Sequence, residues 1–139
     1  MTINTFTEQI RTKGHNECTD LTERVQRAIK EAGITQGLAT IFVPGSTAGV
    51  TTIEYEPGLV GDFQEALQRL FPEDLRYRHH DAPGEDNGFA HLRSSFIGPS
   101  LTVPIVDGRL QLGTWQQIIL VDFDIRARQR SVLIQLLGQ

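Results

Sequence analysis

The sequence has little of what covalent cross-linking or membrane insertion requires. Its single cysteine, Cys18, excludes an intramolecular disulfide and a zinc site of several thiolates, so a metal would need nitrogen and oxygen ligands. We interpret this thiol as structural or incidental. No apolar run approaches the roughly 18 residues of a membrane span, and the N-terminal residues lack the pattern of a secretory signal. We therefore expect a cytoplasmic protein that does not insert into a membrane.

A positive charge excess is also missing. The chain has 13 Lys and Arg against 17 Asp and Glu, a net charge of −4, which argues against nucleic acid as a partner. The local exception is Arg126, Arg128 and Arg130, whose alternate spacing would place them on one face of a strand. We interpret them as a solvated face or as partners in salt bridges between subunits, and binding of a phosphate is the alternative.

Apolar residues at helical spacing predict two main amphipathic helices. The first covers residues 21–32 and ends at Gly33, and the second covers residues 59–71 and ends before Pro72. A third, short helix is expected over residues 89–96. Each main helix has one apolar face, so we expect both to pack on a sheet.

Short β-rich runs between turn signals predict the strands of that sheet. They cover residues 3–12, 38–43, 50–55, 101–106, 109–112, 115–123 and 131–137. The segments 38–43 and 50–55 are expected to be neighbours, and the last two to be central strands covered on both faces. Adjacent strands joined by short turns indicate a single α+β domain over residues 1–139, with a largely antiparallel or mixed sheet and two main helices packed on it.

Three of the four histidines lie in one loop, YRHHDAPGEDNGFAHLRSS, residues 77–95. Imidazole titrates near neutral pH and is a common metal ligand, so this clustering among acids suggests chemistry. If the loop folds back, His79 and His91 meet at one point, but two histidines do not complete a catalytic metal site. The third ligand would come from another subunit or from His80, Asp81, Glu85 or Asp86. Surface or capping histidines are the alternative interpretation.

Two further patterns carry candidate chemistry. In the loop PGSTAG, residues 44–49, glycines would let backbone amides approach an anion, and Ser46 and Thr47 add hydroxyls. A plain turn is the alternative. Glu54 and Glu56 would point the same way on a continuing strand, where paired carboxylates raise one pKa or hold a cation. Solvent-facing glutamates are the alternative there.

Blocks spread over most of the chain resemble the YjbQ-like family. They occur in the family's order: GSTAGVTTIEYEPGLVGDF, then YRHHDAPGEDNGFAHLRSSFIGPSLTVPIVDGRLQLGTWQQIILVDFD, then RARQRSVLIQLLG. The motifs Asn-Gly-x-x-His-Leu, Gly-Pro-Ser-Leu-Thr-x-Pro and Leu-Gly-Thr-Trp-Gln are specific in combination. The resemblance implies a small α+β protein that forms a homotrimer, with a site lined by histidines and acids close to the subunit interface.

Members of this family are commonly labelled secondary thiamine-phosphate synthases. The label implies a transferase that joins a pyrimidine pyrophosphate to a thiazole phosphate and releases pyrophosphate. The resemblance assigns the catalytic positions to Glu54, His79, Asn87, His91 and Gln116. With that activity, a small phosphorylated ligand would lie on Ser46 and Thr47, and a divalent metal, zinc or magnesium, is a candidate cofactor on His79 and His91.

The sequence departs from the family at one site position. Many relatives have a histidine where this chain has Gly45, so one imidazole is missing unless His80 or Asp81 compensates. Two rival functions follow. One is a non-catalytic homotrimer that binds a metal or small ligand, and the other is a structural or regulatory trimer whose histidines serve the interface.

Overall fold

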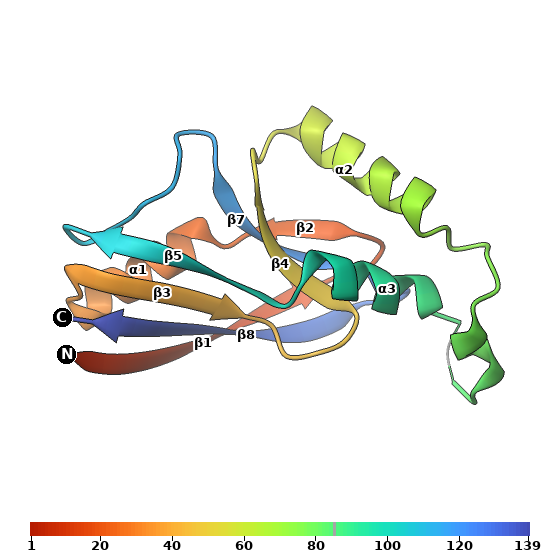
Figure 1. The fold of residues 1–139 in the computed structure, drawn as a ribbon, viewed down its shortest axis with the longest axis horizontal. Coiled ribbons are helices and arrows are strands. Elements are labelled where there is room, and N and C mark those ends of the chain that lie inside the picture. The colour runs from red at the N-terminus through yellow and green to blue at the C-terminus, as the bar shows by residue number, and fades with distance from the viewer. Residues whose placement is uncertain (85) are drawn as a thin grey trace.

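Two antiparallel sheets form the body of the protein in the computed structural model, which describes residues 1–84 and 86–139 (Figure 1). The larger sheet has the strand order β1 (Thr2–Thr12), β8 (Arg128–Gly138), β3 (Gln36–Phe42), β5 (Ser100–Val106), β6 (Arg109–Leu110). The smaller sheet has the order β2 (Glu17–Asp20), β7 (Gln117–Asp122), β4 (Ala48–Ile53). The helices are α1 (Thr22–Ala32), α2 (Pro57–Leu70) and α3 (Gly88–Ile97), with a 3₁₀ turn η1 (Arg78–Asp81).

The main core lies between the inner face of the larger sheet, α1 and the smaller sheet. Side chains alternate along each strand, so every second residue of β8 enters this core, as Val132, Ile134 and Leu136 do. Val25 and Ile29 of α1 are fully buried against them. Burial of each such side chain contributes about 1.5–3 kcal/mol. The predicted α+β class, with antiparallel sheets and packed helices, is confirmed.

A second apolar cluster lies on the other face of β7. There, Ile119 and Val121 pack with Leu67 of α2 and Phe89 of α3. Residues 118 and 120 of the same strand enter the main core, so β7 is covered on both faces, as its sequence predicted. This cluster joins α3, which carries His91, to the smaller sheet.

The prediction that residues 131–137 are covered on both faces is wrong. In the chain, β8 is central in the strand order, but the outer face of its sheet is open, and Leu137 is 39% exposed. We call this surface the outer sheet face. It comprises Ile3, Thr5, Thr7, Gln9, Leu38, Thr40, Phe42, Ser100, Thr102, Pro104, Val106, Ser131, Leu133, Gln135 and Leu137.

Residues 38–43 and 50–55 are not neighbouring strands, which corrects the second strand prediction. β3 pairs with β5 and β8 in the larger sheet, whereas β4 pairs with β7 in the smaller one. The loop of residues 43–47 carries the chain from one sheet to the other. β2 was not predicted, because its four residues, ECTD, show no apolar alternation.

The helix ends follow local sequence signals. Gly33 ends α1 in the left-handed region with φ of 70°, which glycine adopts without strain. Glu56 caps α2, since its carboxylate accepts hydrogen bonds from the amides of Gly58 and Leu59. β4 ends at Ile53, so Glu54 and Glu56 do not form the carboxylate pair expected on one strand face. No helix within the described residues is long and apolar enough to cross a membrane.

Candidate functional site

The structure brings His79 and His91 together, although they are twelve residues apart in the chain. His79 lies in η1 and His91 in α3, and their ring centroids are 4.5 Å apart with an angle of 57° between the planes. The pair borders a cavity of about 420 Å³ lined by Tyr77, Arg78, His79, Gly88, His91 and Leu92. Both imidazoles therefore reach one partly enclosed space.

His80 holds η1 against the start of α3. Its Nε2 lies 3.1 Å from the amide nitrogen of Gly88, and its Nδ1 lies 3.4 Å from that of Tyr77. A neutral imidazole has one acceptor nitrogen, so the ring accepts from one of these amides at a time. A Cβ on Gly88 would lie 2.8 Å from the Cβ of Tyr77, so only glycine fits there. His80 thus positions the loop that carries His79.

Of the loop's acids, the two that the structure describes, Asp81 and Asp86, do not complete a metal site with the histidine pair. Asp81 accepts a hydrogen bond of 2.6 Å from Arg76, and both side chains are exposed. Asp86 is exposed, and Glu85 lies outside the described residues. The ring nitrogens of His80 lie at the amides of Tyr77 and Gly88, and Asp81 bonds to Arg76, so these contacts occupy both side chains that could compensate for the histidine expected at position 45.

The described residues of one chain do not fit a catalytic metal site. Within residues 1–84 and 86–139, no group of three or more His, Cys, Asp or Glu side chains is placed to hold a metal. His79 and His91 supply two nitrogens, whereas catalytic zinc takes three protein ligands. We therefore derive no chemical step through a metal.

A buried carboxylate, Asp124, connects several segments next to His91. It accepts hydrogen bonds from the hydroxyl of Thr47 at 2.8 Å and the amide of Asn87 at 3.2 Å. It also accepts from the backbone of Ile125 and from Nε of Arg128, each at 2.8 Å. Burial raises the pKa of Asp124. The hydrogen bonds and the charge of Arg128 lower it by more than burial raises it, so the net shift is downward. The carboxylate is thus ionised at neutral pH.

A second buried carboxylate, Asp122, forms an ion pair with Arg130. The guanidinium donates from Nε at 2.7 Å and from Nη2 at 2.9 Å, and Thr12 donates its hydroxyl. Burial raises the pKa of Asp122, but the bonds from Arg130 and Thr12 more than offset it, and the net shift is downward. The hydroxyl of Thr47 connects the two carboxylates through Arg130. It accepts a hydrogen bond of 2.8 Å from Nη2 of Arg130, the partner of Asp122, and donates its own proton to Asp124.

The electrostatic surroundings favour the neutral form of His91. Burial, and then the neighbouring His79, lower the pKa of His91 from its ordinary value of 6.5, while Asp124 acts in the opposite direction. A neutral imidazole at physiological pH can accept a proton. His91 is therefore suited to act as a general base toward a ligand in the cavity.

The predicted site residues separate into two groups. Thr47 and Asn87 donate hydrogen bonds to Asp124, whose charge acts on His91, and Ser46 lies exposed beside Thr47. Glu54 and Gln116 lie at the other end of β4, about 20 Å from Thr47 at the usual rise of a strand. The amide of Gln116 accepts from the backbone of Gly113 and donates to Thr52. In one chain these two residues do not reach the histidine pair.

Sequence reasoning missed the carboxylates of the network and misread its arginines. Arg126 precedes β8, while Arg128 and Arg130 pair with Asp124 and Asp122 within the chain. Arg130 is only 8% exposed, so a solvated arginine face is wrong for this residue. The signal was the run VDFD at the end of an apolar strand, because an acid that follows a buried strand needs a buried partner.

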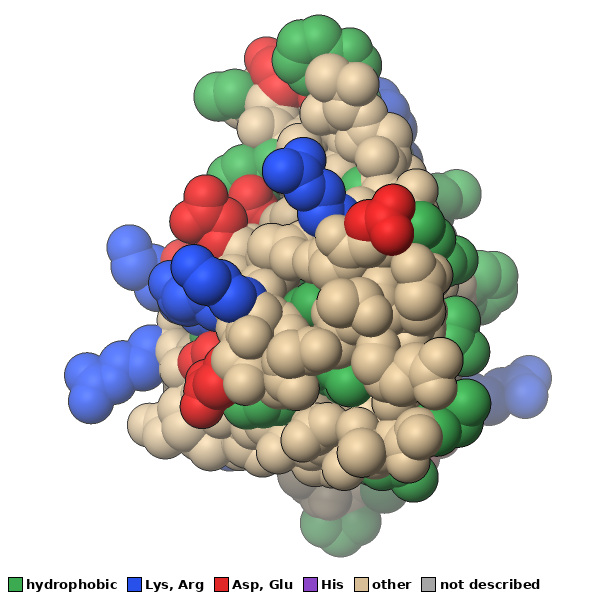
Figure 2. Space-filling view, turned by 90° about the vertical axis from the view of Figure 1, so that its left-hand side faces the viewer, with side chains coloured by type: hydrophobic (Ala, Val, Ile, Leu, Met, Phe, Trp, Pro, Cys, Tyr) green, Lys and Arg blue, Asp and Glu red, His purple; other side chains and the backbone are tan. Residues whose placement is uncertain are grey.

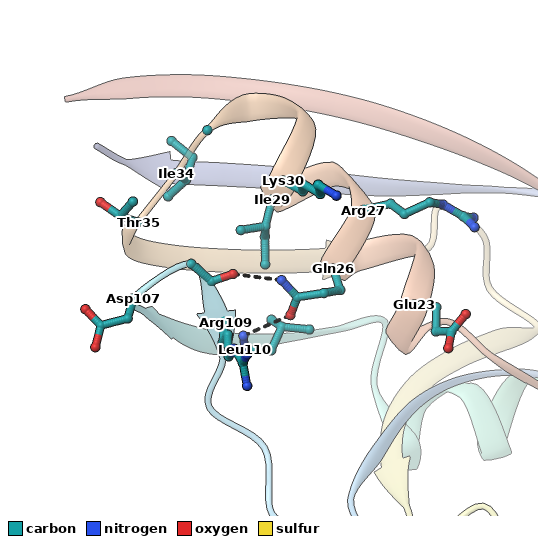
Figure 3. A pocket seen from close by; sticks show the side chains of 12 residues that line it. Glu23, Gln26, Arg27, Ile29, Lys30, Ile34, Thr35, Asp107, Arg109 and Leu110 are labelled. Atoms are coloured by element: carbon teal, nitrogen blue, oxygen red, sulfur yellow. Dashed lines mark hydrogen bonds between the residues drawn. The ribbon is translucent and has the colours of Figure 1, made fainter.

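A larger cavity, of about 770 Å³, lies between α1 and the β5–β6 turn (Figure 3). Figure 1 shows that these elements lie near the end of the molecule that carries both termini. Gln26 crosses the cavity, donating to the carbonyl of Gly108 at 2.7 Å and accepting from the amide of Leu110 at 3.2 Å. The charged ends of Arg27 and Asp107 point away from one another. Figure 2 views this end and shows no histidine on it. The residues described around this cavity include no histidine, and the amide of Gln26 is occupied by backbone groups, so we place the candidate site at the histidine pair.

The thiol of Cys18 does not add a nucleophile. Burial, and secondarily Glu17, raise the pKa of Cys18 to about 11, so the thiolate is scarce at neutral pH. Its Sγ donates to the carbonyl of Asn16 at 3.4 Å. These contacts support the structural interpretation of the only cysteine.

Fold and site define an α+β protein of two antiparallel sheets, with a histidine pair beside a buried network of carboxylates and arginines. The chain belongs to the family described as UPF0047 protein YjbQ-like, whose model matches residues 6–139. A UPF0047 protein of Methanocaldococcus jannaschii is 37% identical over 134 residues, covering 96% of this chain and 94% of that protein. The UPF0047 protein YugU of Bacillus subtilis is 38% identical over 133 residues, covering 95% and 98%.

The fold also matches a solved structure of that family. A crystal structure of a YbjQ-like protein from Sulfolobus solfataricus superposes with a TM-score of 0.89 at 29% identity, covering 99% of this chain and 100% of that one. The resemblance expected from the sequence blocks is therefore confirmed at the levels of family and fold.

Proposed function

We propose that the protein is a homotrimeric transferase of the secondary thiamine-phosphate synthase type. In this reaction the ring nitrogen of a thiazole phosphate attacks the methylene carbon of a pyrimidine pyrophosphate. A carbon–nitrogen bond forms, the carbon–oxygen bond to pyrophosphate breaks, and pyrophosphate leaves with the bonding electrons. The reaction thus requires groups that neutralise a departing polyanion and groups that orient the two rings.

The observation that carries the proposal is the contact between His79 and His91 beside the ionised Asp124 network. The surroundings of His91 favour its neutral form, whose one ring N–H can donate a hydrogen bond to the departing pyrophosphate. Arg78 lines the same cavity and supplies positive charge toward a phosphorylated ligand. Asp124 acts through position, because it fixes Asn87 at the start of the helix that carries His91.

A divalent cation would add charge neutralisation at the pyrophosphate. The described residues of one chain give it only the imidazoles of His79 and His91, so a third protein ligand would have to come from another copy. The roles of the chain's own residues stand without it: His91 donates a hydrogen bond from its ring N–H, and Arg78 and Arg130 bring positive charge toward the phosphates.

The composition of the outer sheet face supports a homotrimer. The central residues of this face carry no charge, and Ile3, Leu38 and Phe42 are 67%, 44% and 40% exposed. Charge on the same face lies at its edges, on Arg11 of β1 and Arg109 of β6. Charged side chains are depleted at the centres of protein interfaces, and contiguous exposed apolar surface marks contact sites. A second and third copy of the chain are the partners we assign to this surface.

The test is to incubate the purified protein with the pyrimidine pyrophosphate and the thiazole phosphate and to quantify pyrophosphate and the joined product. His79→Ala and His91→Ala are each expected to lower turnover about a hundredfold to a thousandfold, the range for loss of one hydrogen-bond donor to developing negative charge. His15→Asn is the matched control, because His15 is exposed with φ of 55°, which asparagine tolerates. Turnover unchanged in both variants, with the fold intact, would remove the histidine pair from the mechanism.

The second candidate is a non-catalytic homotrimer that binds a small ligand. The separation of Glu54 and Gln116 from the histidine pair favours it, because in one chain the assigned catalytic positions do not form one site. Stoichiometric binding of a phosphorylated ligand or a metal without conversion of the two substrates would identify this function.

A further inference from the structure

The geometry points to an anion-binding subsite formed by Nη1 of Arg130 and the backbone amides of Gly45, Ser46 and Thr47, which takes the diphosphate end of a ligand. We call it the Arg130 subsite. The class of ligand assigned to this subsite rests on the proposed function, in which one substrate is a pyrophosphate ester. The contacts that define it are independent of catalysis and can be tested with inorganic pyrophosphate alone.

Arg130 presents a rigid, unused donor. Its side chain is 9% exposed, and Nε and Nη2 are fixed by Asp122 and Thr47 at 2.7–2.9 Å. Within the described residues, Nη1 donates no hydrogen bond. A Cβ built on Gly45 would lie 3.1 Å from Nη1, so this nitrogen faces the loop at a position where no side chain covers it. A buried guanidinium with a free nitrogen is suited to an oxyanion.

The loop supplies neighbouring donors. Among the described residues, the amides of Gly45, Ser46 and Thr47 donate no hydrogen bond, and the first two of these residues are exposed. Gly45 has φ of 133°, a conformation that favours glycine. Successive free amides in such a turn form a concave anion-binding nest.

The hydroxyl of Thr47 does not contribute a donor, which refines the expectation that it binds phosphate directly. Its one proton is donated to Asp124 at 2.8 Å, and its oxygen accepts from Nη2 of Arg130. Thr47 is therefore a positioning residue for the guanidinium. Through Asp124 and Asn87, the same hydrogen-bond chain reaches the first turn of α3, so an anion on Arg130 is mechanically linked to the helix that carries His91.

The experiment is a calorimetric titration of the intact protein with inorganic pyrophosphate, and in parallel with inorganic phosphate. Arg130→Lys keeps the positive charge and a contact to Asp122. A compact ammonium group lacks the planar fork of a guanidinium, so it cannot contact Asp122 and also present a donor to the loop. We expect a loss of affinity for pyrophosphate of about tenfold to a hundredfold, as for one charge-assisted hydrogen bond. Arg109→Lys is the control, since Arg109 lies on β6 beside the other cavity.

Gly45→Ala is the second variant, because it covers Nη1 while leaving the Asp122–Arg130 pair intact. Gly45 lies in an exposed loop. If thermal melting shows that Arg130→Lys is unfolded, the Gly45→Ala variant alone tests whether pyrophosphate binds at the Arg130 subsite. We expect it to weaken pyrophosphate binding at least about tenfold, again as for one charge-assisted bond. No binding to the wild-type protein at millimolar pyrophosphate, or equal affinity in the wild-type protein and the folded variants, overturns the Arg130 subsite.

The two proposals fail in different ways. Pyrophosphate binding that depends on Arg130, without any joining of the substrates, leaves the subsite in place and removes the synthase function. Joining of the substrates with an unchanged KM for the pyrimidine pyrophosphate in Arg130→Lys supports the function and removes the subsite.

Discussion

At the scale of single residues, burial has opposite outcomes for His91 and Asp124. His91 has few partners that stabilise a charge, so burial and the adjacent His79 lower its pKa. Asp124 is more deeply buried, yet hydrogen bonds from Ile125, Thr47, Asn87 and Arg128 keep it ionised. A neutral imidazole and an ionised carboxylate thus coexist near neutral pH, which is the separation of roles that acid–base chemistry needs.

We predict that His91 titrates below pH 6.5, and that His79→Ala raises its pKa by removing a neighbouring positive charge. The folded protein then binds this proton less readily than the unfolded chain does. His91 therefore weakens stability as the pH falls below 6.5, while its base form persists below that pH. The C2 proton resonances of the histidines, followed by NMR between pH 4 and 9, measure both effects. Titration of His91 above 6.5 would contradict the assigned surroundings.

The Asp122–Arg130 pair gives a second prediction. Asp122→Ala leaves a buried guanidinium without its counter-charge, so we expect a loss of about 3–5 kcal/mol in the free energy of unfolding, measured with urea. The matched control is Asp81→Ala, whose pair with Arg76 is exposed and should cost less than about 1 kcal/mol. If the two variants lower the free energy of unfolding equally, the buried Asp122–Arg130 pair does not stabilise the fold more than the exposed Arg76–Asp81 pair does.

The same carboxylates set the acid limit of the fold. The pKa values of Asp122 and Asp124 in the folded state lie below 3.8, so their stabilisation is fully present above that pH. It is lost as the pH falls through the folded-state values. Single-residue effects of this kind were not predictable from the sequence, because the partner of Asp122 lies eight residues away on another strand.

At the scale of elements, the helices and long strands were predictable because their patterns are local. The apolar spacing of residues 21–32 and the stop at Gly33 reproduce α1, and alternation over residues 3–12 reproduces β1. The assignment of β3 and β4 to different sheets was not predictable, because strand pairing depends on contacts distant in sequence. The approach of His79 to His91 was predictable only as a consequence of loop folding.

Glu54 and Glu56 show how one element boundary changes a functional interpretation. Alternation along a continuing strand would place both carboxylates on one face. The strand ends at Ile53, and Pro57 begins α2, so Glu56 becomes the helix cap while Glu54 remains exposed. A proline after a β-rich run is the signal that could have favoured the cap.

The junction of α2, α3 and the β1–β2 turn depends on Arg93. This guanidinium is fully buried, donates to Asn16, Gln68 and the carbonyl of Phe71 at 2.6–3.0 Å, and lies 4.7 Å from the ring centroid of Phe89. We predict that Arg93→Met lowers the free energy of unfolding by about 2–4 kcal/mol, since buried acceptors lose their donors.

The measurement for Arg93 is urea denaturation followed by circular dichroism. Arg69→Met on exposed α2 surface is the control, and its effect should stay within about 0.5 kcal/mol. If both variants unfold at the same urea concentration, the arginine does not hold the helices on the smaller sheet.

At the scale of the whole molecule, the outer sheet face is the surface to which we assign the contacts of the proposed homotrimer. We predict that Leu137→Lys prevents this assembly, because a lysine at an apolar interface would be desolvated without a counter-charge. Leu59→Lys on α2 is the control, since Leu59 is 37% exposed and Leu137 is 39% exposed. Light scattering of the wild-type protein should give three times the chain mass of 15.5 kDa. Retention of the trimer in Leu137→Lys would place the interface elsewhere.

We propose that the histidine pair and the Arg130 subsite bind one phosphorylated ligand together. The most direct measurement is an NMR titration of the native protein with inorganic pyrophosphate, observing the C2 protons of His15, His79 and His91. The account predicts saturable shifts of His79 and His91 with a common dissociation constant, while His15 stays unchanged. If the resonances of His79 and His91 do not move, or move no more than that of His15, the account is contradicted.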